Sequence, residues 1–429
     1  MGKDIIVKSE RIVSEGLCIA KLENGKILLI KGALPNETLR CNILKETKSY
    51  LLSEVKEIID PSPFRRPSLC KYSNQCGGCS FSYIDYHYQL HLKKDIIRDN
   101  LKRIAKIELP DIKVIASDKT LGYRNRIRLQ FKTGLGIGYF SQGSHRFIPI
   151  ERCLLARAPI RKIMPYIFSF FKEYKRDSLE GQIELISPIN ETKVFCSISS
   201  KKIKEAREIL EELIRANLIE AGTAIVKKQI VFKGKSRLRW PYIIDVNGLR
   251  RKFFIETIPG GFSQINWQQN LKVINKILTE AENIKCNTVL DLYSGFGNIA
   301  IPVSFICKDV IAVEQNFLGT KALKENIKRL GINNITVKHE KVERYIDKIV
   351  KGRKVELIIL DPPRSGAKEV IKTIKAKGIP NIFYLSCSPT TFSRDIRMLL
   401  DYNYKIKEII AYDFFPHTHH IELLIMLDQ

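Results

Sequence analysis

The chain is poor in acidic residues for its size and lacks any long apolar run. It carries 46 Asp and Glu against 72 Lys and Arg, a formal net charge of +26. This excess favours a polyanionic partner, RNA or DNA, over a basic surface that is merely solvated. No run reaches the ~18 apolar residues of a membrane-spanning helix, and the first residues lack a signal-type apolar core. We therefore expect a cytoplasmic protein that does not enter membranes.

Internal repeats and low-complexity tracts are also missing, which excludes solenoids and fibrous arrays. At 429 residues the chain exceeds one ordinary core, because domains typically span roughly 50–200 residues. The Pro-rich segment 60–67 can continue neither a helix nor an interior strand, so it predicts a boundary. We expect three domains, at residues 1–60, 61–255 and 256–429.

The first domain has the pattern of a small β-barrel. Strands are expected at residues 16–22 and 26–30, joined by Glu23-Asn24-Gly25, where Asn-Gly favours a tight hairpin turn. A turn at Leu34-Pro35-Asn36-Glu37 precedes another strand over residues 38–44. The segment resembles the TRAM module, an OB-like RNA-binding barrel, although such strands alone fit many small barrels.

Four of the ten cysteines are candidates for an inorganic centre. Cys70, Cys76 and Cys79 form C-x5-C-x2-C, and the glycines between the last two let the backbone wrap closely around a ligand. Cys153 is the best candidate for the fourth thiolate, because it follows a turn-rich segment of the same α+β region. Four thiolates suit an iron-sulfur cluster or a structural zinc, and spacing alone does not separate the two.

Three arginines alternate along a strand-like segment of the same region. Arg124, Arg126 and Arg128 would lie on one face of a strand. That face would either hold phosphates or form a solvated, protected edge.

From residue 270 onward the pattern alternates helix and strand, which indicates a mainly parallel sheet. The apolar strand 288–292 runs into a glycine-bearing turn, and strand 310–313 ends in Glu314, whose carboxylate can accept hydrogen bonds from ribose hydroxyls. Dinucleotide-binding folds share both features. Strand 357–360, however, runs into Asp361-Pro362-Pro363-Arg364, which resembles the fourth-strand motif of S-adenosylmethionine methyltransferases.

One thiol lies at the end of the next apolar strand. Cys387 follows Ile382-Phe383-Tyr384-Leu385, at the sheet edge where such folds bind their ligands. A free thiol has a pKa near ~8.5, so a nucleophile here needs nearby positive charge, for which Arg364 is the candidate. A buried structural thiol is the alternative.

Taken in order, these motifs resemble the RNA uracil-5-methyltransferase family over essentially the whole chain. The four-cysteine version is similar to the iron-sulfur enzymes that act on 23S rRNA, although cluster-bearing members that act on tRNA exist. The motifs are C-x5-C-x2-C, Phe262-Ser263-Gln264-Ile265-Asn266, residues 291–298, Asp361-Pro362-Pro363-Arg364, Ser386-Cys387-Ser388-Pro389 and residues 415–422.

The resemblance implies a reaction and its residues. Cys387 would add to carbon-6 of uracil so that carbon-5 can accept a methyl group, and Glu422 would then remove the carbon-5 proton. The target base would have to flip out of its stack. Lys341 departs from the Asn or Asp that the family commonly has there. The implied ligands of S-adenosylmethionine are Gln264, Tyr293, Asn298, Glu314 and Asp361; those of a [4Fe-4S] cluster, favoured over zinc, are Cys70, Cys76, Cys79 and Cys153.

The expected fold is therefore a multidomain α/β chain. An OB-like TRAM barrel (1–60) precedes a central α+β domain with the cysteine cluster (61–255) and a Rossmann-like methyltransferase domain (256–429). We expect a monomeric enzyme that acts on 23S rRNA. The alternatives are the same reaction on tRNA and a non-catalytic RNA-binding or assembly protein.

Overall fold

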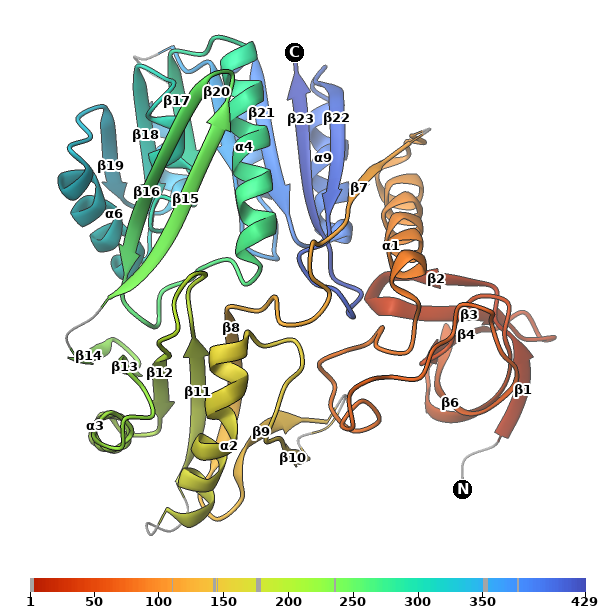
Figure 1. Ribbon diagram of the computed structural model, residues 1–429. Helices are drawn as coiled ribbons and strands as arrows, with labels where there is room; N and C mark the ends of the chain where they lie inside the picture. The colour runs from red at the N-terminus through yellow and green to blue at the C-terminus, as the bar shows by residue number, and fades with distance from the viewer. Residues whose placement is uncertain are drawn as a thin grey trace.

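The computed structural model describes residues 4–109, 111–141, 144, 146–174, 179–234, 237–349, 354–375 and 378–429. The described strands form sheets of six, seven and eight strands and a two-stranded hairpin (Figure 1). None of the helices in these ranges is both long and apolar enough to span a bilayer.

The six-stranded sheet curls into the N-terminal barrel. Its strands alternate buried and exposed residues, and Leu28 and Ile30 are fully buried in its core. The predicted hairpin turn is present, with the Lys26 amide donating to Asn24 Oδ1 at 3.0 Å. The spatial order is β1 (Asp4–Lys8), β5 (Thr38–Glu46), β6 (Tyr50–Asp60), β4 (Ile27–Lys31), β3 (Leu17–Lys21) and β2 (Arg11–Val13).

A buried ion pair ties the Pro-rich segment to this barrel. Arg65 donates from Nε and Nη2 to the carboxylate of Glu37, both at 2.6 Å, and Glu37 is 0% exposed. The amides of Leu34 and Ser62 donate to the same carboxylate. The charge is therefore paired and hydrogen-bonded, as burial requires.

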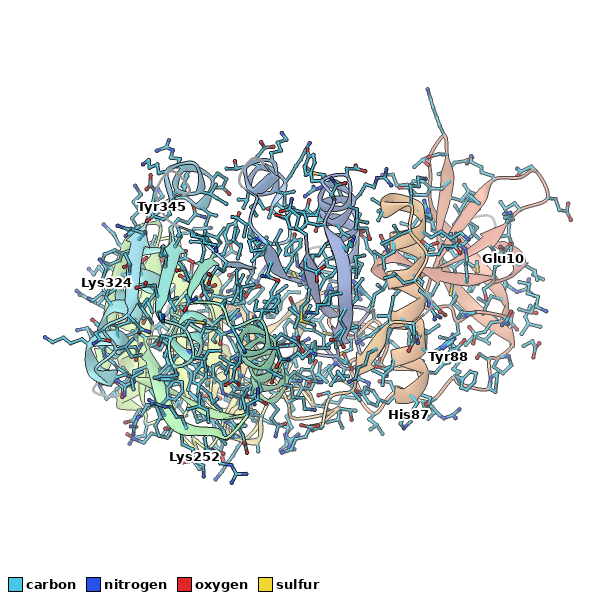
Figure 2. All side chains as sticks on the ribbon, turned by 90° about the horizontal axis from the view of Figure 1, so that it is seen from above. Glu10, His87, Tyr88, Lys252, Lys324 and Tyr345 are labelled. Atoms are coloured by element: carbon cyan, nitrogen blue, oxygen red, sulfur yellow. The ribbon has the colours of Figure 1, made fainter. Side chains whose placement is uncertain are left out.

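Helix α1 (Tyr86–Asn100) stands between the barrel and the C-terminal sheet, as Figure 2 shows from above. Asp85 caps its first turn by accepting from the amides of His87 and Tyr88. A π-helical turn, Leu101–Ala105, continues it. Arg11 on the barrel donates to Asp99 at 2.7 Å, so α1 contacts both sides.

The seven-stranded sheet forms the central part of the molecule. Two helices, α2 (Ala158–Glu173) and α3 (Ile203–Arg215), share one apolar core with it. Its order is β10 (Phe147–Pro149), β9 (Gly136–Phe140), β8 (Arg126–Lys132), β11 (Glu180–Ile186), β12 (Phe195–Ser200), β13 (Ala221–Val226) and β14 (Gln229–Gly234).

The eight-stranded sheet carries the predicted methyltransferase motifs. Its first five strands are parallel, and β23 inserts antiparallel between β21 and β22. The order is β19 (Ile335–His339), β18 (Asp309–Glu314), β17 (Thr288–Leu292), β20 (Leu357–Leu360), β21 (Asn381–Ser386), β23 (Glu422–Asp428), β22 (Lys405–Tyr412) and β7 (Lys113–Ile115).

Successive strand residues face opposite layers, which explains the near-continuous apolar strands. One face packs on α4 (Trp267–Asn283), α5 (Ala300–Val303), α6 (Phe317–Leu330) and the hairpin of β15 (Leu238–Val246) and β16 (Leu249–Thr257). The other packs on α7 (Val342–Ile349), α8 (Lys368–Lys375) and α9 (Pro389–Leu400).

Several elements from residues 61–255 contact the C-terminal sheet, and α1 with the turn that follows it shares one apolar core with that sheet. Strand β7 pairs with β22, and the β15–β16 hairpin contributes Trp240 and Tyr242 to the core around α4. We propose three domains at 1–60, 61–255 and 256–429, of which the second and third share these elements.

Candidate active site and cysteine pocket

The candidate catalytic residues gather at one edge of the eight-stranded sheet. Glu314 ends β18, Asp361 directly follows β20, and Cys387 directly follows β21. Because these strands are parallel neighbours of β17, their carboxyl ends meet at the same edge. The sheet thus brings together three residues that the sequence places far apart.

Glu422 reaches this edge from the opposite direction. Strand β23 begins with Glu422 and runs antiparallel to β21, with Ser386 paired to Leu423. Cys387 follows the last paired residue of β21, and Glu422 precedes that residue's partner, Leu423, so both lie at the same end of this strand pair. The charge of Glu422 raises the pKa of the Cys387 thiol, so the two groups lie near each other.

The Cys387 thiol is held in its protonated form. Burial raises its pKa to about 11, the charges of Glu422 and Asp361 act in the same direction, and Arg364 opposes them. Arg364 therefore lowers the pKa of the thiol, as expected, but in the ligand-free protein this effect is smaller than that of burial.

Buried carboxylates surround the thiol. Burial, followed by the nearby charge of Asp361, raises the pKa of Glu422 well above its ordinary value. Burial and the charge of Glu314 raise the pKa of Asp361 to about 6. Asp291, on β17, has its pKa raised strongly by burial and by Asp361. The charges of Glu422, Asp291 and Glu314 thus each act on, or are acted on by, that of Asp361.

Asp291 is a site residue that the motif analysis did not single out. It is 1% exposed, and neither of its carboxylate oxygens has a hydrogen-bond partner of ordinary geometry. The nearby Ala300 amide acts to lower the pKa of Asp291, but the effect of burial is larger. Its signal in the sequence is an acid inside an otherwise apolar strand. The side chain of Ser294, close by in the chain, is also buried without a partner.

The turn after β17 is held by Glu314. The Gly295 amide donates to Glu314 Oε2 at 2.9 Å, and the Asn316 amide donates to Oε1 at 2.5 Å. A carboxylate offers about four acceptor positions, so two remain for hydroxyl groups of a ligand. Gly297 has φ +92, and an added Cβ would lie 2.5 Å from Leu323, so this turn requires glycine there.

Three further residues that are predicted to bind the methyl donor lie in the same turn and in the loop before α4. Tyr293 has φ +64 and donates its hydroxyl to Glu343 at 3.1 Å. Asn298 accepts from Tyr242 and Asn270 through Oδ1 and donates to Asn270 through Nδ2, which leaves one N–H for a ligand. The Gln264 carbonyl accepts from Asn125.

These features fit S-adenosylmethionine, which carries a sulfonium and an ammonium group. Orphaned buried oxygens on Asp291 and a cluster of carboxylates are suited to a cation. Glu314 has acceptors to spare for a ribose. Lys341 lies immediately before α7, whose Glu343 binds Tyr293.

Helix α1 fixes the loop that leads into β23. Lys93 donates from Nζ to Asp413 Oδ1 at 2.6 Å and to the Phe415 carbonyl at 3.0 Å, and both charged side chains are 0% exposed. The Tyr86 hydroxyl donates to Asp413 Oδ2 at 2.9 Å. Gln89 accepts from the His417 amide at 2.8 Å. This loop, residues 413–421, is called the base loop below.

The segment that follows Cys79 is hydrogen-bonded to the base loop. The Phe81 amide donates to the His417 carbonyl at 2.9 Å, and the His419 amide donates to Ser80 Oγ at 3.1 Å. Gly16 of the barrel fits against both, because an added Cβ would lie 2.8 Å from Phe81 and 2.9 Å from His419. Barrel, cysteine segment and base loop therefore meet at one point.

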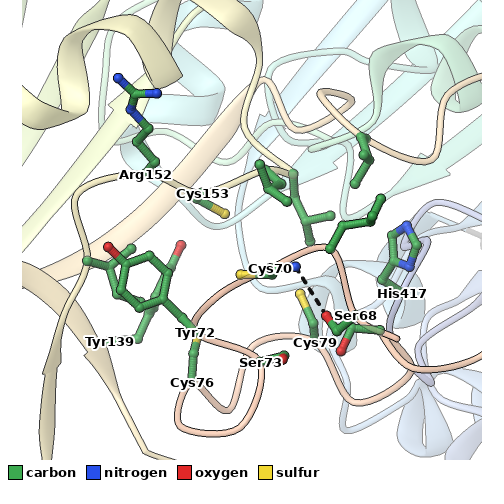
Figure 3. A pocket seen from close by; sticks show the side chains of 16 residues that line it. Ser68, Cys70, Tyr72, Ser73, Cys76, Cys79, Tyr139, Arg152, Cys153 and His417 are labelled. Carbon is green, nitrogen blue, oxygen red and sulfur yellow. Dashed lines mark hydrogen bonds between the residues drawn. The ribbon is translucent and has the colours of Figure 1, made fainter. Parts of the chain in front are cut away.

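The four predicted cysteine ligands line one pocket of about 60 Å³ (Figure 3). Burial raises the pKa of Cys79 to about 12 and that of Cys76 by less. As they stand, the described residues contain no group of three or more His, Cys, Asp or Glu placed to hold a metal ion. Cysteine thiolates are the ligand type of both [4Fe-4S] clusters and structural zinc sites, so the residue types that line this pocket suit either centre.

The expectation of three arginines on one strand face is wrong. Strand β8 begins at Arg126, and Arg124 lies before it, beside the ring of Tyr123. Arg126 and Arg128 both reach Glu184, at 3.6 and 3.2 Å. These arginines are engaged within the protein, although the Arg128 side chain remains 62% exposed.

Comparisons with known proteins agree with this geometry. The family model for tRNA (uracil-5-)-methyltransferase matches residues 85–429, and that for the TRAM domain matches residues 3–56. Their order confirms the predicted barrel and methyltransferase domains.

Relatives are similar over nearly their whole length. The 23S rRNA (uracil(1939)-C(5))-methyltransferase RlmD of Haemophilus ducreyi is 29% identical over 98% of this chain and 94% of its own. An "Uncharacterized RNA methyltransferase" of Aquifex aeolicus is 29% identical over 99% of both chains.

Among solved structures, the tRNA (uracil-54, C5)-methyltransferase of Pyrococcus abyssi, in complex with S-adenosyl-L-homocysteine, has a TM-score of 0.74 and 23% identity. It covers 98% of this chain and 99% of that one, which shows a shared fold. With the family model matching most of the chain, this protein belongs to the tRNA (uracil-5-)-methyltransferase family and is an S-adenosylmethionine-dependent RNA (uracil-5-)-methyltransferase.

Proposed function

We propose that this enzyme methylates carbon-5 of a uridine in 23S rRNA through a covalent Cys387 adduct, with Glu422 as the base. The observation that supports the mechanism is the pairing of β21 with β23, whose last pair, Ser386 and Leu423, is followed by Cys387 on one strand and preceded by Glu422 on the other. The nucleophile attacks carbon-6, and the base removes a proton from carbon-5, the adjacent carbon of the same ring. The two side chains must therefore lie close to each other.

The chemistry assigns one step to each residue. The Cys387 thiolate adds to carbon-6 of the flipped uracil, which makes carbon-5 nucleophilic. S-adenosylmethionine, when bound, supplies the methyl group to that carbon. Glu422 then takes the carbon-5 proton, the carbon-5 to carbon-6 double bond re-forms, and the bond from carbon-6 to sulfur breaks to return the thiolate.

We expect the first step of the reaction, the addition of the Cys387 thiolate, to depend on pH. Burial raises the pKa of both Cys387 and Glu422 and so favours their protonated forms in the ligand-free protein. A cation bound among Asp291, Glu314 and Asp361 would lower the pKa of each group nearby. Donor binding would thus favour ionisation of the thiol and carboxyl groups that the reaction uses.

Two variants test the mechanism with RNA that carries 5-fluorouridine. The wild-type enzyme should form a covalent adduct on Cys387, because fluorine replaces the proton that the base must remove. Cys387→Ala should bind RNA and form none. Glu422→Gln should accumulate adduct with ordinary uridine, since proton removal is lost. Methylation by Cys387→Ala would disprove the nucleophile.

The relatives named as 23S rRNA enzymes favour that substrate over tRNA. The test is mass mapping of 5-methyluridine in RNA from cells with and without the gene. Loss at a 23S rRNA position supports the proposal. Loss only from tRNA transfers the activity to that substrate, a reading favoured by the name of the matching family model. No loss from either RNA would leave an RNA-binding or assembly role.

We also propose that the pocket of Cys70, Cys76, Cys79 and Cys153 holds a [4Fe-4S] cluster. Its support is that all four cysteines line one pocket, where burial raises the pKa of Cys76 and Cys79 and so makes bare thiolates unfavourable without a metal centre. Anaerobic purification should yield iron and inorganic sulfide in equal amounts. A colourless protein with one zinc ion would replace the cluster by zinc, and Cys76→Ala should lower solubility in either case.

A polar groove between the barrel and the cysteine segment is the proposed path of the RNA. It has a volume of about 1420 Å³, and its lining includes Lys31, Lys45, Arg66 and Lys71. Basic side chains in a groove contact phosphates without reading the bases. Lys45→Glu combined with Lys71→Glu should weaken RNA binding and flatten its salt dependence, while donor affinity stays unchanged.

A further inference from the structure

Helix α9 clamps the turn that carries Arg364. Three of its side chains, spaced i, i+3 and i+4, contact consecutive parts of this turn. Thr391 Oγ1 donates to the Arg364 carbonyl at 3.1 Å, and Arg394 Nη2 donates to the Ser365 carbonyl at 3.0 Å. Asp395 Oδ2 accepts from the Ala367 amide at 2.8 Å. One helical face thus holds the backbone on both sides of Gly366.

Asp395 is the centre of this clamp and is 0% exposed. Oδ2 also accepts from the Tyr384 hydroxyl at 2.7 Å, and Oδ1 accepts from Arg394 Nε at 2.8 Å and Nη2 at 2.6 Å. A carboxylate has about four acceptor positions, and these four donors occupy them. No position remains for a substrate, so Asp395 can act only through the groups that it holds.

Gly366 lets the turn approach this carboxylate. Its φ is +79, and an added Cβ would lie 2.4 Å from Asp395 Oδ2 and 2.5 Å from Arg394 Nη2. The close approach is therefore possible only without a side chain at this position.

The clamp connects directly to the candidate nucleophile. Helix α9 begins at Pro389, and Ser388 caps it by accepting from the Thr391 amide, so the helix cap directly follows Cys387. Arg364, on the clamped turn, is exposed at the open edge of the site. Its positive charge lies close enough to both Cys387 and Glu422 to lower the pKa of each group.

We propose that Asp395 is a positioning residue for methyl transfer: together with Thr391 and Arg394 it holds the turn so that Arg364 stays beside Cys387 and stabilises the thiolate. The inference rests on the proposed role of Cys387. The clamp belongs to the reaction because it holds a cation near the reacting sulfur, and the acceptor positions of Asp395 are already filled by protein donors.

The rate at which iodoacetamide alkylates Cys387, measured against pH in the full-length protein, tests this. Trypsin releases residues 378–394, a peptide whose only cysteine is Cys387, so mass spectrometry follows this thiol alone. Thr391→Val removes one hydrogen bond to the turn, and Asp395→Asn weakens the bond from the Ala367 amide together with the contacts to Tyr384 and Arg394. Thr390→Val is the matched control, because Thr390 hydrogen-bonds Asn100 of α1 instead.

Asp395→Asn should slow alkylation at pH 8 by about tenfold, which corresponds to a rise of roughly one unit in the midpoint of the pH profile. Thr391→Val should shift the midpoint in the same direction by less, and Arg364→Met should set the upper limit. Thr390→Val should leave it in place.

A purely structural role would lower the melting temperature of Asp395→Asn and leave the alkylation midpoint unchanged, which would overturn the proposal. The variant Thr391→Val carries the same test if Asp395→Asn does not fold. Failure of the underlying function is separate: it would show as wild-type protein that forms no adduct with 5-fluorouridine RNA, whatever the alkylation profiles show.

Discussion

Lys93→Met should destabilise the C-terminal half of the molecule and slow catalysis. It removes the partner of Asp413 at a place where both side chains are 0% exposed, while Tyr86 and the Phe415 amide still donate to the remaining carboxylate. Breaking a buried pair from one side costs about 3–5 kcal/mol, because an uncompensated charge is left behind. At about 2–4 °C for each kcal/mol in a unit of ~150–250 residues, the melting temperature should fall by roughly 6–20 °C.

The assay is thermal unfolding followed by calorimetry, with kcat measured below the transition. The double variant Lys93→Met, Asp413→Asn should recover much of the loss, because no lone charge remains. Lys94→Met is the control, since Lys94 pairs with the exposed Asp111 and such pairs contribute about 0–1 kcal/mol. A shift for Lys93→Met no larger than that for Lys94→Met, or a double variant no better than the single one, would refute the reasoning.

Three other perturbations follow from buried groups. S-adenosylmethionine should bind more weakly as pH falls through about 6, because burial and a second carboxylate raise the pKa of Asp361 to about 6 and protonation removes a charge that attracts the cation. Calorimetric titration should show this decrease of affinity with falling pH, and Asp361→Asn should abolish the pH dependence. Arg65→Met should cost about 3–5 kcal/mol by stranding Glu37, seen as lost amide protection in the barrel, and unchanged protection would contradict it. Gly16→Ala should lower kcat and the melting temperature, because φ is +71 and the new Cβ would strike Phe81; wild-type values would show that the junction adjusts freely.

The strands of the C-terminal sheet could be read from the sequence because their residues are apolar on both faces. Strand β17 and strand β20 match the predicted ranges 288–292 and 357–360. Parallel strands buried on two sides must be apolar throughout, which makes them stand out from their surroundings. By contrast, β7 has three residues, and its pairing with β22 depends on a contact distant in the chain. Local patterns carry no information about such a partner.

Site residues divide in the same way. Those at the ends of predictable strands, such as Glu314, Asp361 and Cys387, could be placed at one edge from topology alone. The clamp of Asp395 could not, because an acid inside a helix gives no sign of the turn that it will meet. The arginines show the opposite case: Arg126 and Arg128 alternate along β8 and both reach Glu184, but Arg124 lies before the strand, a boundary that alternation alone does not reveal.

The meeting of Gly16, Phe81 and His419 limits how this enzyme can be rebuilt. If the barrel only bound RNA, it could be exchanged between relatives, and the substrate specificity would be transferred with it. Here the barrel touches the same loop that leads to Glu422, through a glycine with no room for a methyl group. Retargeting the enzyme with a foreign barrel would therefore require transplanting the barrel turn, the cysteine segment and the base loop as one matched set, and a chimera that exchanged only residues 1–60 should bind its new RNA but methylate it poorly.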